Sequence, residues 1–158
     1  MKKFLTFFIM TLGSGVLLAQ DIQITEAPEY YQLYPRNAQN VAEVTVAGIV
    51  ADDGHENLIL KTYRDGQLVQ TIEEEIKPNK QGEYPFSLKQ QIKAGLHQYK
   101  FRLLLADGSK STEVFAVDSM VCGDAYIITG QSNSHASSSM STYSSPYCRS
   151  FGVKTGYN

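Results

Sequence analysis

Short stretches in which apolar and polar side chains alternate fill most of the sequence between residues 21 and 118. The clearest stretches are residues 41–51, 58–64 and 97–106. Alternation with a period of two is the pattern of a strand that buries one of its faces. Asp-Gly pairs tolerate the positive φ of tight hairpin turns, and they occur at Asp53-Gly54, Asp65-Gly66 and Asp107-Gly108. The sequence therefore predicts β-strands joined by hairpins.

The complete pattern predicts a mainly β fold with no helix between residues 20 and 118. We expect strands at residues 30–34, 41–51, 58–64, 67–77, 84–90, 97–106 and 111–117, with a longer connection at Pro78-Asn79 and Gly82. Ten Tyr and seven Phe agree with a β-rich composition. Seven short strands in a domain of about one hundred residues fit an immunoglobulin-like or fibronectin-like β-sandwich.

Charged and titratable side chains in this region are expected on the surface. Glu73, Glu74 and Glu75 predict a solvated edge strand, because charges on an edge discourage pairing with another sheet. His55 and His97 have no neighbours at metal-ligand spacing, so we interpret both as surface histidines. The sequence predicts no metal site and no cofactor.

The first 19 residues predict a signal peptide. Lys2 and Lys3 precede a mostly apolar stretch at residues 4–18, and Ala19 is a small residue suited to cleavage. This stretch is shorter than the about 20 residues of a transmembrane helix, so we expect export to the periplasm, cell surface or medium, without a membrane span. The chain carries 14 Lys and Arg against 16 Asp and Glu, which argues against a nucleic-acid partner.

The composition changes after Asp118. The apolar run that ends at residues 126–128 does not alternate, which favours a strand buried on both faces of an α/β sheet. Gly130 permits a sharp turn after it, and Ser132 can follow at the start of a helix, where backbone N–H groups stabilise a developing oxyanion. A serine at this position is also a common helix N-cap. The G-x-S-x-G elbow is not matched, because Ser134 replaces its second glycine.

Residues 123–133 read Gly-Asp-Ala-Tyr-Ile-Ile-Thr-Gly-Gln-Ser-Asn. This segment resembles the first conserved block of the sialate O-acetylesterase and acetylxylan esterase group within the SGNH (GDSL-like) hydrolase superfamily. Residues 31–36, Tyr-Gln-Leu-Tyr-Pro-Arg, and the predicted sandwich are similar to the β-sandwich module that precedes the catalytic domain in some secreted members. The sequence pattern and this resemblance together predict three parts: a signal peptide at 1–19, a sandwich at 20–118 and the start of an SGNH domain at 119–158.

The resemblance implies a role for four residues. Ser132 matches the nucleophile that attacks an acetyl ester, and its backbone N–H would contribute to the oxyanion hole. Gly130 and Gln131 match positions that shape the nucleophile loop. Asp124 matches a structural position, which we expect to bond the backbone near the strand. The implied substrate is an acetylated carbohydrate.

The family's base is a histidine in an Asp-x-x-His block near the end of the catalytic domain. His135 is the only histidine after Ser132, and within one helical turn its imidazole would point away from the nucleophile. No Asp or Glu follows Asp124. Several βα units of about 30 residues each are needed for an α/β hydrolase domain. We therefore expect this sequence to be a fragment that lacks the base and has no esterase activity on its own.

Cys122 and Cys148 leave two alternatives open. In an oxidising compartment they can form a disulfide, and they can equally be two separate thiols. The function also has two readings. One is an exported carbohydrate esterase that uses Ser132, and the other is a non-catalytic exported binding or adhesion module in which the sandwich alone acts.

Overall fold

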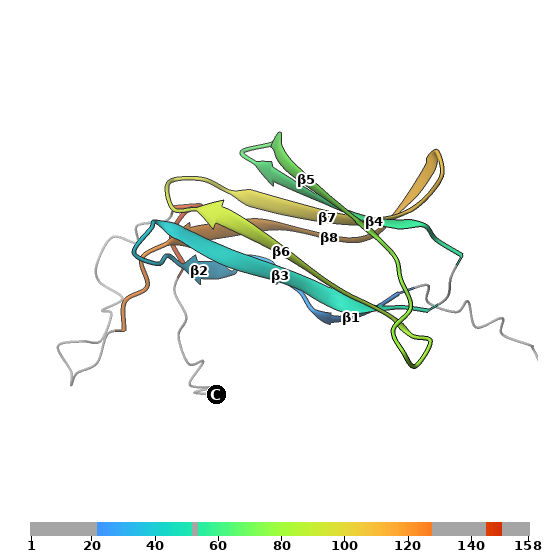
Figure 1. Cartoon of the computed structure of the whole chain (residues 1–158). Coiled ribbons are helices and arrows are strands. Elements are labelled where there is room, and N and C mark those ends of the chain that lie inside the picture. Colours follow the sequence, from blue (N-terminus) through green and yellow to red (C-terminus); the bar gives the residue numbers. More distant parts are fainter. Residues whose placement is uncertain (1–21, 52–53, 128–144, 150–158) are drawn as a thin grey trace, which may run out of the picture.

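The computed structural model describes residues 22–51, 54–127 and 145–149, which contain eight strands and no helix (Figure 1). The strands are β1 (Ile22–Glu26), β2 (Leu33–Pro35), β3 (Val41–Val50), β4 (Asn57–Arg64), β5 (Gln67–Glu75), β6 (Tyr84–Lys93), β7 (Tyr99–Asp107) and β8 (Lys110–Gly123). The described part of the chain is therefore mainly β, as predicted. The expected signal peptide at residues 1–19 lies outside the described residues.

The strands form two sheets that face each other as two layers (Figure 1). One sheet has the order β1-β3-β6 and the other the order β2-β8-β7-β4-β5. All pairs are antiparallel except β2 and β8, which run parallel and pair Leu33 with Val121 and Pro35 with Gly123. The arrangement is a β-sandwich. In its larger sheet, β2, which comes first in the sequence, lies beside β8, which comes last.

Alternating side chains of both sheets form one hydrophobic core. Val44 and Val46 of β3 are fully buried, and they share the core with Leu60 of β4 and Phe101 of β7. Burial of each such side chain contributes about 1.5 to 3 kcal/mol. The period of two seen in the sequence of these strands is thus the alternation between core and solvent.

The turns follow the predicted chemistry. Asp65 and Gly66 between β4 and β5 have φ of 51° and 82°, the conformation that an Asp-Gly pair tolerates in a two-residue hairpin. The Asp65 carboxylate accepts the backbone N–H of Gln98 at 2.9 Å and lies 2.6 Å from Nδ1 of His97. His97 is therefore a partly exposed histidine that pairs with a turn residue. Asp53 lies outside the described residues.

The seven predicted strands are present with shifted ends, and β1 was not predicted. Glu73, Glu74 and Glu75 are exposed on β5, which is an edge strand as expected.

The last strand differs most from the prediction. β8 continues to Gly123, so the expected domain boundary at Asp118 falls inside a strand of the sandwich. Ser119 has a φ of 64°, and the three residues after it, Met120, Val121 and Cys122, are all buried. This part of β8 pairs with β2, and it therefore completes the sandwich sheet.

None of the described residues belongs to a helix that is long and apolar enough to cross a membrane.

Candidate functional site

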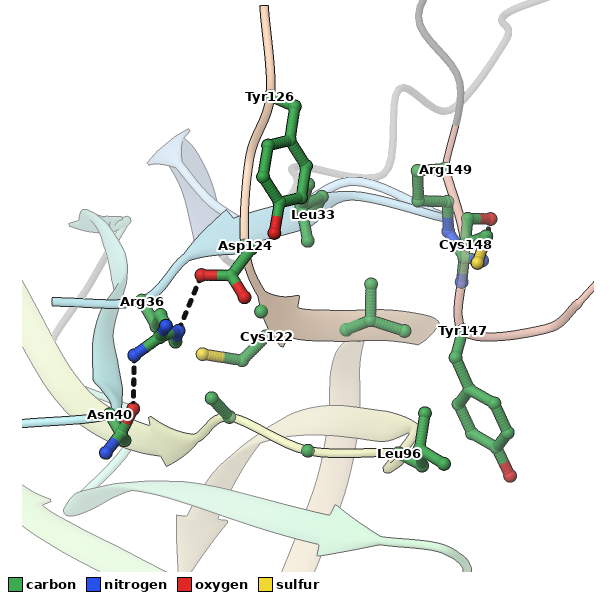
Figure 2. A pocket seen from close by; sticks show the side chains of 14 residues that line it. Leu33, Arg36, Asn40, Leu96, Cys122, Asp124, Tyr126, Tyr147, Cys148 and Arg149 are labelled. Carbon is green, nitrogen blue, oxygen red and sulfur yellow. Dashed lines mark hydrogen bonds and ion pairs between the residues drawn. The ribbon is translucent and has the colours of Figure 1, made fainter.

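The end of β8 borders a pocket of about 590 Å³ at one end of the sandwich (Figure 2). Its walls come from β2, from the loop that follows β6, from the residues at the end of β8 and from the segment at residues 145–149. Three exposed hydrophobic side chains surround it, namely Leu96, Tyr126 and Tyr147. The pocket therefore marks the point at which the chain leaves the sandwich toward the segment that holds Ser132.

Asp124 is held by a side chain from the other end of the sequence. Nε of Arg36 donates to Oδ1 of Asp124 at 2.7 Å, and Nη1 of Arg36 donates to Oδ1 of Asn40 (Figure 2). The backbone N–H of Arg36 donates to the carbonyl oxygen of Gly123 at 2.8 Å. The carboxylate of Asp124 thus bonds a side chain, whereas we expected a bond to the backbone near the strand.

The two segments that carry the family resemblance meet here. Residues 31–36 contain β2, and residues 123–133 begin at the last residue of β8, which pairs with Pro35. The Arg36–Asp124 ion pair continues this contact beyond the strands. Arg36 is not identifiable as the partner of Asp124 from sequence, because 88 positions separate the two residues.

Both cysteines line the pocket, and both are free thiols. Cys122 is buried at the end of β8, whereas Cys148 is exposed in the segment at residues 145–149. Burial raises the pKa of the Cys122 thiol, and the backbone of Ala42 and the charge of Arg36 oppose this shift. Burial and the raised pKa both disfavour reaction of Cys122, because the thiolate is the nucleophilic form.

Arg149 attaches the segment at residues 145–149 to the sandwich. Its Nε donates to the carbonyl oxygen of Tyr31 at 2.8 Å, and its Nη2 donates to that of Ser119. The guanidinium also lies 5.3 Å from the centre of the Tyr31 ring, within cation–π range. Tyr31 and Ser119 both have a positive φ. Sequence reasoning missed this contact, since it depends on two unusual backbone conformations that no motif marks.

Tyr126 and Ile127 follow the sandwich without joining a strand. They are 82% and 92% exposed, although their sequence fits a strand buried on both faces. The predicted buried strand at this position is therefore absent from the described residues up to Ile127. Both sides of β8 are already paired, with β2 on one side and β7 on the other.

The predicted catalytic segment itself lies outside the described residues. This holds for Ser132, for Gly130 and Gln131, and for His135. Within the described residues no group of three or more His, Cys, Asp or Glu side chains is placed to hold a metal ion. The described pocket provides a paired Arg and Asp, a buried thiol and exposed aromatic side chains.

No family model matches this chain, and no curated protein matches its sequence.

Proposed function

We propose that this chain is part of an exported carbohydrate esterase of the SGNH superfamily, similar to the sialate O-acetylesterases. The sandwich is its accessory module, and residues after Gly123 begin its catalytic domain. The observation that carries the proposal is the Gly-Asp…Gly-Gln-Ser-Asn segment at residues 123–133, which leaves the sandwich at the end of β8. The parallel pairing of β2 with β8 supports it, because it joins the two segments that resemble the family.

The exposed residues after Asp124 also support a further sheet. Tyr126 and Ile127 are large apolar side chains, yet most of their surface is exposed to solvent. A single strand cannot bury both of its faces, so these side chains need a neighbouring sheet to cover them. In the proposed enzyme this stretch is the first strand of the α/β sheet. Ser132 then stands at the end of that strand, where a nucleophile is accessible to substrate.

The proposed reaction is acyl transfer to Ser132. Its Oγ attacks the carbonyl carbon of the acetyl ester, a histidine takes the hydroxyl proton, and the sugar hydroxyl leaves with a proton from that histidine. Water then attacks the acetyl-enzyme and releases acetate. The backbone N–H of Ser132 stabilises the oxyanion. We place the histidine in an Asp-x-x-His block of the natural protein beyond Asn158, because no Asp or Glu follows Asp124 in this sequence.

Hydrolysis of p-nitrophenyl acetate by the natural full-length protein tests this proposal. We expect Ser132→Ala to remove turnover, by about 10⁴-fold or more for a catalytic nucleophile. Ser134→Ala is the matched control and is expected to keep activity. Turnover that survives Ser132→Ala would exclude Ser132 as the nucleophile, and turnover by the 158-residue chain on its own would overturn the placement of the base.

A non-catalytic exported binding module is the second candidate. The observation in its favour is that residues between Ile22 and Cys122 form the hydrophobic core of the sandwich. On this reading the natural protein has no esterase activity and Ser132 is an ordinary helix cap, so the same assay separates the two functions.

A further inference from the structure

Two residues of the sandwich hold a backbone conformation that their side chains disfavour. Four described residues other than glycine have a positive φ, and two of them, Asn40 and Asp65, are of the types that tolerate it. Tyr31, at 62°, and Ser119, at 64°, are not. Strained backbone of this kind persists where the surrounding structure requires it, and it is common at functional sites. Tyr31 precedes β2 and Ser119 lies within β8, so each of the two strands that pair in parallel has one strained residue at or near it.

Both strained residues present their carbonyl oxygens to one guanidinium group. Nε of Arg149 donates to the carbonyl oxygen of Tyr31 at 2.8 Å, and Nη2 donates to that of Ser119. Nη1 donates to the carbonyl oxygens of Pro146 at 2.7 Å and Cys148 at 3.0 Å, in the segment of Arg149 itself. All three nitrogens of the guanidinium are therefore bonded to backbone oxygen, and none of these bonds involves a carboxylate.

The arrangement is specific for arginine. A guanidinium presents its donors in a rigid planar fork, whereas the ammonium of lysine is a single point of charge on a flexible stem. The fork bonds the carbonyl oxygens of Tyr31 and Ser119 at the same time, and its carbon lies 5.3 Å from the centre of the Tyr31 ring. The sandwich thus contains a site that is shaped for the guanidinium of residue 149.

This contact determines where the chain returns to the sandwich. The chain leaves β8 at Gly123, where the ion pair of Arg36 and Asp124 holds its exit. The segment at residues 145–149 returns to the same end, and the exit and the return both line the first pocket (Figure 2). Ser132 lies between these two attachments in the sequence. Attachment of both ends of a segment restricts the conformations open to the residues between them.

We propose that Arg149 is a positioning residue for Ser132. By docking on Tyr31 and Ser119 it fixes the second end of the segment that carries the nucleophile. The sandwich is then more than an attached module, because it holds this segment on both sides. The docking is a property of the present chain, whereas its effect on catalysis rests on the proposed function.

NMR of the 158-residue chain tests the docking without any assay of activity. We expect the Nε–H resonance of Arg149, assigned by its loss in Arg149→Lys, to exchange slowly with water because it is hydrogen-bonded. Arg102→Lys, on the solvent-facing row of β7, is the control and leaves this resonance unchanged. Rapid exchange of the Arg149 Nε–H in the wild type would overturn the docking.

Two variants of Ser119 test whether its conformation presents the acceptor. Both Ser119→Gly and Ser119→Val remove the hydroxyl that bonds Asp118, but only glycine adopts a positive φ freely. We expect slow exchange of the Arg149 Nε–H to be kept in Ser119→Gly and lost in Ser119→Val. Loss of slow exchange in Ser119→Gly would contradict the role of this backbone.

Chemical rescue in the natural full-length protein tests the effect on catalysis. We expect Arg149→Ala to lower kcat for p-nitrophenyl acetate by about 10- to 100-fold with little change in KM, since a small displacement of the nucleophile is costly. Ethylguanidinium at millimolar concentration should restore part of kcat, and ethylammonium should not. Arg102→Lys should keep the wild-type kcat.

Unchanged kcat in Arg149→Ala, or a loss that ethylguanidinium does not restore, would overturn the positioning role. Absence of turnover in the wild type would contradict the proposed function instead, and the NMR result would still decide whether Arg149 docks.

Discussion

The ion pair of Arg36 and Asp124 illustrates how single residues act in this protein. Its side chains are 37% and 48% exposed, so the pair contributes at most about 1 kcal/mol to stability. Its effect is positional, because Arg36 also bonds the backbone of Gly123 and the side chain of Asn40. The three contacts together fix the direction in which the chain leaves β8.

The two cysteines should differ in their reactivity toward thiol reagents. We expect one thiol, Cys148, to react rapidly with a disulfide reagent in the native chain, because it is exposed. Cys122 should react only after denaturation, since burial shields it and raises its pKa. Thiol counting with and without denaturant, and the loss of the rapid phase in Cys148→Ser, check this. Absence of reactive thiols in denatured, unreduced protein would instead demonstrate a disulfide.

Tyr34 gives the sandwich a pH dependence at the alkaline end. Burial, with the charges of Glu26 and Glu29, raises the pKa of Tyr34 from 10.0 to about 12. The unfolded chain loses this proton at lower pH than the folded chain does, so the free energy of unfolding falls between these two values. We expect the free energy of unfolding, measured in urea, to fall less between about pH 9 and about pH 11 in Tyr34→Phe than in the wild type. An equal fall in both proteins would contradict the shift.

Local chemistry was predictable from sequence, and contacts between distant residues were not. Asp65-Gly66 identified its hairpin, because positive φ restricts the residues that can form it. Arg149 gave no such signal, since its acceptors are carbonyl oxygens of Tyr31 and Ser119. Any residue has a carbonyl oxygen, and only the fold selects these two.

At the level of elements, β1 and β8 show where periodicity is informative and where it is not. Burial alternates over seven or more residues in β3, β4 and β7, and all three strands were predicted. β1 has five residues and one buried side chain, Ile22, so its pattern is too short to recognise. Burial in β8 does not alternate, and Met120, Val121 and Cys122 are buried in succession, which hid the sandwich part of this strand.

Gly48 determines how closely β1 approaches β3. A Cβ at this position would lie 2.2 Å from the carbonyl oxygen of Gln23 and 3.0 Å from Cα of Ile24. Both contacts are with backbone, so β1 has to shift. We expect Gly48→Ala to lower the free energy of unfolding by about 1 to 3 kcal/mol.

Urea unfolding provides the measurement for this glycine. Gly123→Ala is the control, because a Cβ there meets nothing within 4 Å, and it should be close to the wild type. Equal stability of Gly48→Ala and Gly123→Ala would show that β1 is not held against Gly48 as described.

For the whole molecule, the two-layer sandwich was predictable and the catalytic arrangement was not. The core depends on patterns within single strands, such as those that bury Val46 and Phe101. A hydrolase site depends on residues that several distant segments bring together, and this sequence carries a match to only one of them, around Ser132. The proposal for the whole protein therefore rests on that segment and on its exit from β8.

Covalent labelling of the natural full-length protein tests the central claim most directly. An organophosphate such as diethyl p-nitrophenyl phosphate phosphorylates a serine that a histidine activates, and peptide mass spectrometry locates the product. We predict one diethylphosphoryl group on Ser132, with labelling lost in Ser132→Ala and kept in Ser134→Ala. An unlabelled Ser132, or a label on another residue that persists in Ser132→Ala, would contradict the assignment of Ser132 as the nucleophile.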